Sequence, residues 1–147
     1  MKRKEFEHCI NENELLETGD KDLALASELL KLGEHKQMFW NEAKLEEKYP
    51  SLYIEGHYEI IKELCTAILA LDGWKAMNHE CLFAYLKAKK KMLELDFDYL
   101  LELKDARNSI DYRGVRVSAD IWAQNKLKIK IVIKTLSDYV RKELGKR

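Results

Sequence analysis

Hydrophobic residues recur every three or four positions through most of this chain, which is the spacing of an amphipathic helix. The pattern predicts main helices over residues 21–47, 52–71, 79–91, 93–111 and 119–144, and a shorter helix over residues 4–17. The helix over residues 52–71 is apolar on most sides, so we expect it at the centre of the fold. The sequence therefore predicts an all-α fold, an antiparallel helical bundle of four to five main helices with an N-terminal helical extension.

Residues at the ends of these segments support the boundaries. Asp20, Asn78 and Ser118 stand where helix N-caps are expected. Pro50 is expected to end the helix before it, because a residue preceding proline disfavours helical geometry. Residues 128–134 partly alternate like a strand, but the sequence offers no convincing partner strand, and a helix is predicted there. Without repeats or linkers, residues 1–147 are predicted to form one domain with its core at about 20–144.

Composition limits the classes of function. The chain has 26 basic and 26 acidic residues, so no overall field favours nucleic acid or an acidic membrane. Its apolar runs are far shorter than the roughly 20 residues that cross a bilayer, and its start lacks the apolar region of a secretory signal. Cys9, Cys65 and Cys81 are odd in number and lack CxxC spacing, which predicts no disulfide framework and a reducing, cytoplasmic location.

Few residues suggest a metal or cofactor site. His79-Glu80-Cys81 begins like a zinc-protease helix, but Phe83 stands where that pattern requires a second histidine. His8 and Cys9 could join His79 and Cys81 in space, although apolar neighbours favour a structural role for the cysteines. The chain also lacks a glycine-rich phosphate loop. We therefore predict no metal and no cofactor.

Basic residues offer a candidate nucleic-acid-binding edge. Lys126, Lys130 and Lys134 follow one another at four-residue spacing on the last predicted helix, and Arg113 and Arg116 come shortly before it. Together they could bind the phosphates of a nucleic acid. The alternative is that these lysines only solvate the outside of the bundle.

Arg107 occupies an unusual position for a charged residue. It comes four residues after Leu103 and three before Ile110, on or beside an apolar stripe, where burial is costly without a partner. One interpretation is an ion pair with Asp111, one helical turn later. The other is a guanidinium that faces a groove, beside Asn108 and Tyr112, and holds a phosphate.

Two segments resemble the HEPN superfamily. That family's signature has an arginine, a polar residue that is often asparagine, three further residues and a histidine near the end of a helix. Here Arg107 and Asn108 match, and Tyr112 occupies the histidine position. Residues 71–82 resemble the family's turn after the central helix, where a Gly-aromatic-Lys stretch precedes a Ser/Asn-His-Glu helix start. The resemblance covers roughly residues 20–144.

The resemblance implies a homodimer in which two arginine motifs meet. Active family members are metal-independent ribonucleases, many of them toxins neutralised by a small nucleotidyltransferase, whereas other members serve as binding domains. A tyrosine with a pKa of about 10 is a poor base at neutral pH. The leading hypothesis is therefore a catalytically weak or inactive member that binds RNA, a nucleotide or a nucleotidyltransferase. The alternatives are an active ribonuclease using Arg107, Asn108 and Tyr112, and a purely structural interaction module.

Overall fold

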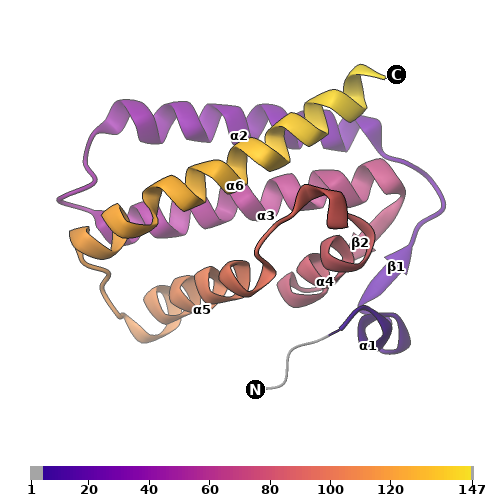
Figure 1. The fold of residues 1–147 in the computed structure, drawn as a ribbon, viewed down its shortest axis with the longest axis horizontal. Coiled ribbons are helices and arrows are strands. Elements are labelled where there is room, and N and C mark those ends of the chain that lie inside the picture. The colour runs from indigo at the N-terminus through magenta and orange to yellow at the C-terminus, as the bar shows by residue number, and fades with distance from the viewer. Residues whose placement is uncertain (1–4, 147) are drawn as a thin grey trace.

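The computed structural model describes residues 5–146 as a bundle of long helices with a small sheet at one end (Figure 1). Helices make up 76% of it, which confirms the all-α prediction. In chain order the elements are α1 (Phe6–Asn11), β1 (Leu15–Glu17), α2 (Leu23–Ala43), α3 (Pro50–Asp72), β2 (Trp74–Ala76), α4 (His79–Lys89), the short 3-10 helix η1 (Lys91–Leu93), α5 (Phe97–Arg113) and α6 (Ala119–Gly145).

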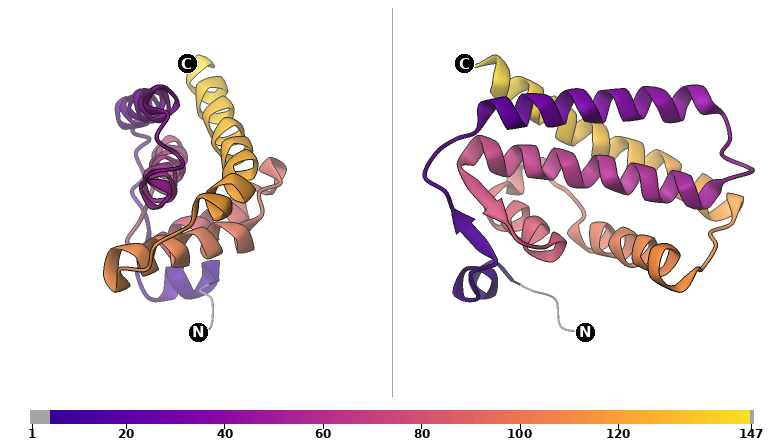
Figure 2. Two further views of the ribbon diagram at one scale, coloured as in Figure 1. Left: turned by 90° about the vertical axis from the view of Figure 1, so that its left-hand side faces the viewer. Right: turned by 180° about the vertical axis from the view of Figure 1, so that it is seen from behind.

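The helix α3 lies at the centre, as its apolar sequence predicts. It contacts α2, α4, α5 and α6, and most of its side chains are buried. Views from the side and from behind show α2 and α3 running alongside each other, with α6 crossing the pair and α5 below α3 (Figure 2). In the described part of the chain, no helix is both long enough and apolar enough to cross a membrane.

The N-terminal extension differs from its prediction. The helix expected over residues 4–17 ends at Asn11, and Asn13 adopts a left-handed backbone conformation with φ of 58°. The chain then forms β1, which pairs antiparallel with β2 so that Leu15 lies opposite Ala76. Pairing between segments so far apart along the chain leaves no local pattern, which is why the strands were missed. Residue 4, the first of the predicted helix, lies outside the described part of the chain.

Several helix ends follow the predicted capping residues. Asn78 and Ser118 accept hydrogen bonds from backbone N–H groups in the first turns of α4 and α6, as predicted. Asp22, rather than Asp20, caps α2 through the Leu25 N–H at 2.9 Å. The prediction that Pro50 ends the preceding helix was wrong, because α2 ends at Ala43, followed by Lys44 in a left-handed conformation. Pro50 instead begins α3, where its missing N–H costs nothing.

The close packing of α2 on α3 depends on a glycine. A Cβ atom at Gly56 would lie 2.4 Å from the ring of Trp40, well inside any allowed contact. Trp40 in turn packs against Tyr53, with ring centroids 4.7 Å apart. The glycine inside α3, unfavourable by helix propensity, thus allows the indole of α2 to reach the centre of the bundle.

The predicted absence of a disulfide was wrong. Cys9 in α1 and Cys81 in α4 form a disulfide across 72 residues of sequence, while Cys65 remains a free, buried thiol. Their pairing depends on how α1 docks on α4, which neither the count nor the spacing of cysteines reveals. The predicted reducing compartment rested on that count and therefore loses its basis.

Reduction of this disulfide is expected to lower the melting temperature (Tm) by roughly 10 °C. Closing a loop of this length restricts the unfolded chain and contributes roughly 4 kcal/mol to the free energy of unfolding. The Tm can be measured by circular dichroism with and without a reducing agent. The Tm of a Cys9→Ala/Cys81→Ala double variant should not change when the reductant is added. The Tm of Cys65→Ala should still fall. An unchanged Tm of the reduced natural chain would contradict the expectation.

Candidate functional site

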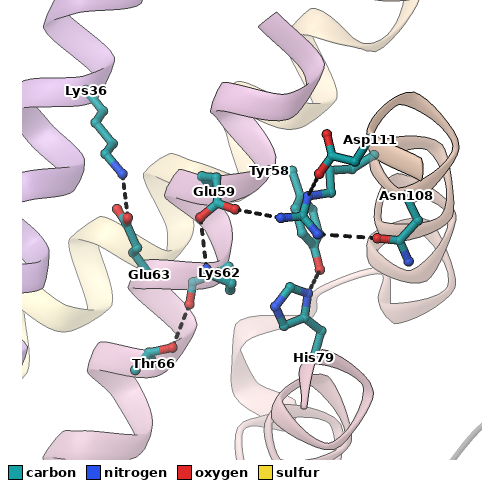
Figure 3. Close-up of polar contacts among 10 residues, drawn as sticks. Lys36, Tyr58, Glu59, Lys62, Glu63, Thr66, His79, Asn108 and Asp111 are labelled. Atoms are coloured by element: carbon teal, nitrogen blue, oxygen red, sulfur yellow. Dashed lines mark hydrogen bonds and ion pairs between the residues drawn. The ribbon is translucent and has the colours of Figure 1, made fainter. Parts of the chain in front are cut away.

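Arg107 of α5 is held by acidic and polar groups from two helices. Its Nε lies 2.9 Å from an Asp111 carboxylate oxygen, and one terminal nitrogen lies 3.1 Å from Glu59 of α3. The other terminal nitrogen donates to the Asn108 side-chain oxygen at 3.3 Å. Figure 3 shows these three partners directed toward the same point between α3 and α5. The Arg107–Asp111 pair, one of the two interpretations of the sequence, is therefore present, and Glu59 adds a second carboxylate.

The Arg107 guanidinium also lies over an aromatic ring. Its central carbon is 5.8 Å from the centroid of the Tyr58 ring, close enough for a cation–π interaction. The Tyr58 hydroxyl is in turn 2.7 Å from Nδ1 of His79, the first residue of α4. Burial of Tyr58 raises the pKa of its phenol well above the usual value, so the hydroxyl keeps its proton. Arg107, Tyr58 and His79 therefore connect α5, α3 and α4 in one polar cluster.

His79 is a neutral imidazole at neutral pH. Burial lowers its pKa most, and the nearby positive charges of Lys62, Arg107 and Lys104 lower it further, although Glu59 opposes them. Lys104 itself is bound to Glu80 at 2.8 Å. A neutral imidazole that is partly accessible can accept or donate a proton, which makes His79 the best-placed histidine for chemistry beside Arg107.

Glu59 is the carboxylate that ties this cluster to a lysine. One of its oxygens binds Arg107, and the other lies 2.9 Å from Lys62. Partial burial of Glu59 disfavours its charged form, but the hydrogen bond and charge of Lys62, together with Arg107, outweigh the burial and lower its pKa. Glu59 is therefore ionised and offsets part of the positive charge of Arg107 and Lys62.

Glu55 forms a second acidic group at the same edge of α3. Its pKa rises to about 7, because burial disfavours its charge and because it shares a hydrogen bond with the nearby Asp111 carboxylate. The charge of Arg107 only partly offsets these effects. Glu55 and Asp111 thus share a proton that an ordinary glutamate would have lost at neutral pH.

The predicted catalytic residues do not all meet. Arg107 and Asn108 are in contact, but Tyr112 is 77% exposed, and its side chain has no hydrogen bond to any other described residue. Among the predicted trio, only the first two share a site.

The basic residues predicted to bind nucleic acid have mixed settings. Arg113 and Arg116 are exposed at the end of α5 and in the following loop. On α6, the ammonium of Lys126 lies 2.9 Å from Glu46, Lys130 donates to Asn41 at 3.2 Å, and Lys134 lies 2.7 Å from Asp138. Two of the three lysines are thus paired with carboxylates of the same chain, and a nucleic acid would have to compete with them.

Sequence reasoning missed the α3 side of the cluster. Glu55, Glu59, Lys62 and Thr66 follow one another at steps of four, three and four residues, which places them along one side of the helix. A polar stripe on a helix that is otherwise apolar is a readable signal, since those side chains require partners from neighbouring elements. Glu63, beside the stripe, binds Lys36 of α2 in the same way (Figure 3).

Two other groups of interest lie away from Arg107. His57 is buried among Trp40, Tyr53 and Trp122, and burial lowers its pKa to about 4, so it acts as a neutral core residue. Within residues 5–146, the side chains close enough to share a metal ion are Cys9, Glu14 and Cys81. Both sulfurs are engaged in the disulfide and cannot ligate a metal in that state.

The raised pKa of Glu55 predicts a specific pH dependence of stability. Because its pKa in the folded chain, about 7, exceeds the ordinary 4.5, the stability that Glu55 contributes is complete below about pH 4.5 and is lost as the pH rises to about 7. Thermal melts at about pH 5 and about pH 8 should show a smaller fall in Tm for Glu55→Gln than for the natural chain. Glu47→Gln, at an exposed position, is the control, and its Tm should fall as much as that of the natural chain. Equal falls in all three proteins would contradict the assignment.

Comparisons of the chain with protein-family models, curated proteins and solved structures found no match. The resemblance to the HEPN superfamily therefore rests on residues 71–82 and 103–114 and on the order of the helices. What it implies for function is a proposal.

Proposed function

We propose that this chain is a HEPN-like homodimeric protein that is catalytically weak or inactive and acts by binding. Its ligand is RNA or a nucleotide, or a nucleotidyltransferase partner, and the binding surface surrounds Arg107. The motif residues Arg107 and Asn108 and the helix order support the family assignment. The contacts of Arg107 and the position of Tyr112 support the loss of catalysis.

The observation that carries this proposal is the double ion pairing of Arg107. With Glu59 and Asp111 both in place, the guanidinium is neutralised and only 19% of its side chain is exposed. A phosphate would have to replace one of these carboxylates before Arg107 could hold it bidentately. Displacing a carboxylate costs free energy both when RNA binds and when it is cleaved. We therefore expect any cleavage of RNA to be weak.

A row of exposed apolar residues on α2 supports self-association. Leu25, Leu32 and Phe39 follow one another at seven-residue spacing, so they share one side of the helix, and they are 42%, 42% and 61% exposed. Lys36 lies between Leu32 and Phe39 and binds Glu63 of α3, which is beside the polar stripe of that helix. The α2 row therefore borders the polar stripe of α3. A second copy packed on the α2 row would bring the Arg107 clusters of two chains toward each other.

One observation keeps the active-ribonuclease alternative open. His79 is a neutral imidazole that is linked to Arg107 through Tyr58, which contacts both residues. It could take the role in proton transfer that the exposed Tyr112 does not fill. An active enzyme of this architecture would use Arg107 to bind the phosphate and His79 to transfer the proton. The structural alternative, in which Arg107 only ties α5 to α3, predicts no ligand at all.

Binding and cleavage of RNA separate these three functions. We expect the natural chain to bind a labelled single-stranded RNA in fluorescence polarisation, without cleaving it in the presence of a chelator. Arg107→Ala should weaken binding about tenfold through the loss of a charge-assisted contact. Arg141→Ala is the matched control, since Arg141 is an exposed arginine that is also paired with two carboxylates.

Two outcomes would replace the proposal. Cleavage in chelator that disappears in both Arg107→Ala and His79→Ala would establish the ribonuclease. Failure of RNA, nucleotides and a nucleotidyltransferase to bind the natural chain, together with a lower Tm of Arg107→Ala, would leave the purely structural role.

The homodimer is tested by light scattering at micromolar concentration. The natural chain should show twice the mass of one chain, and Leu32→Glu/Phe39→Glu should show a monomer, because charges in an apolar interface oppose association. Leu127→Glu is the control, since Leu127 is 72% exposed but belongs to α6 and not to the α2 row. A monomeric natural chain would rule out a site formed by the Arg107 clusters of two chains.

A further inference from the structure

A pocket of about 700 Å³ opens beside the Arg107 cluster. Its walls come from the segment between β1 and α2, the second half of α3, β2 and the first turns of α4. Lys62 and His79 belong to both the cluster and the pocket, whereas Arg107 itself is not part of the lining. The pocket is large enough for a small organic molecule and much larger than an inorganic anion needs.

Lysines give the pocket a cationic rim. Lys21, Lys62 and Lys75 line it from three different elements. Lys62 is bound to Glu59, but Lys21 and Lys75 form no ion pair with any residue in the described part of the chain. Asp20 and Asp22 also lie at the pocket, and Asp22 is engaged in capping α2. Because Glu59 already offsets the ammonium of Lys62, the positive charge that the pocket offers an anion comes from Lys21 and Lys75.

His79 adds a polar group with a fixed orientation. Its Nδ1 is occupied by the Tyr58 hydroxyl, and Figure 3 shows the other ring nitrogen turned toward the side on which Lys62 and Thr66 lie. When the Tyr58 hydroxyl donates to Nδ1, the second nitrogen carries the proton and becomes a donor. Because that imidazole is neutral, it can donate to an anion without adding a buried charge.

The remaining wall is apolar. Leu69 and Leu82 are almost fully buried at the pocket, and Leu25 and Met77 are partly exposed around it. Trp74 is held in place by its contacts with Phe6 and Tyr85, at ring-centroid distances of 6.0 and 5.4 Å. Thr18, Thr66 and Asn78 also line the pocket, but their side chains are engaged in hydrogen bonds within the chain. The apolar wall therefore favours a hydrocarbon body.

We propose that this pocket binds a small amphiphilic phosphate ester. The phosphate lies among Lys62, Lys75 and the His79 side chain, and the hydrocarbon part of the ester lies against Leu69, Leu82 and Trp74. The pocket shares Lys62 and His79 with the Arg107 cluster and Leu25 with the α2 row. The proposal does not rest on the proposed function, because neither the Arg107 side chain nor a second chain is needed to bind the ester.

Calorimetric titration of the full-length chain with octyl phosphate, below its micelle concentration, tests the proposal. Saturable 1:1 binding is expected, and shortening the tail from octyl to ethyl should weaken it about two- to fourfold for each methylene removed from the apolar wall. The Trp74 indole N–H resonance should shift in NMR spectra on titration. Inorganic phosphate, without a tail, should bind much more weakly.

Variants of the rim identify the site. Lys75→Gln and His79→Ala should each weaken octyl phosphate binding about tenfold, since each removes a donor to the phosphate. Lys44→Gln is the control, because Lys44 is exposed at the end of α2 and does not line the pocket. Melting temperatures would show that the variants remain folded, and Lys75, being exposed, is the safer of the two.

Several results would overturn the proposal. Octylammonium binding as tightly as octyl phosphate would mean that Asp20 and Asp22, rather than the lysines, determine the charge of the ligand. Adenosine monophosphate binding more tightly than octyl phosphate would exclude a hydrocarbon body as the preferred one. Binding that is unchanged in both Lys75→Gln and His79→Ala would place the ligand elsewhere.

Loss of RNA binding in Arg107→Ala with intact octyl phosphate binding would confirm that the two sites are independent.

Discussion

Burial of α3 is the constraint on which the rest of the structure depends. A helix surrounded by neighbours cannot leave charged side chains without partners, because desolvation of an unpaired charge costs more than packing returns. The polar stripe of α3 therefore dictates what its neighbours carry. Glu63 requires Lys36 from α2, Glu59 requires Arg107 from α5, and the Tyr58 hydroxyl finds His79 at the start of α4. The candidate site is the place where these requirements are met.

Arg107 therefore has two structural roles. Its pairing with Glu59 fixes the position of α5 against α3, and the stacking on Tyr58 orients the hydroxyl that holds His79. A residue that supports the fold in this way is not free to reorganise around a ligand without a penalty. The pocket on the other side of His79 has less of this conflict, since Lys21 and Lys75 hold no part of the described fold together through ion pairs, whereas Lys62 is already paired with Glu59.

Local features of the sequence were enough to predict much of the fold. The caps at Asn78 and Ser118 and the apolar periods of α3 and α6 depend only on residues within a few turns, so the main helices were found. The Arg107–Asp111 pair could be considered for the same reason, because its members are one turn apart. What joins distant segments was missed: the β1–β2 pairing, the Cys9–Cys81 disulfide, and the Glu59–Arg107 ion pair across 48 residues.

The disulfide between Cys9 and Cys81 divides the oxidised chain into a covalently closed loop and an open C-terminal segment. The segment from α1 to the start of α4, with α2 and α3 inside it, is a covalently closed ring even when it is unfolded, while α5 and α6 hang from that ring as an open tail. In the folded chain α6 packs against α3, an element inside that ring. Oxidation thus lowers the entropy of one half of the denatured ensemble and leaves the half that carries Arg107 as mobile as before.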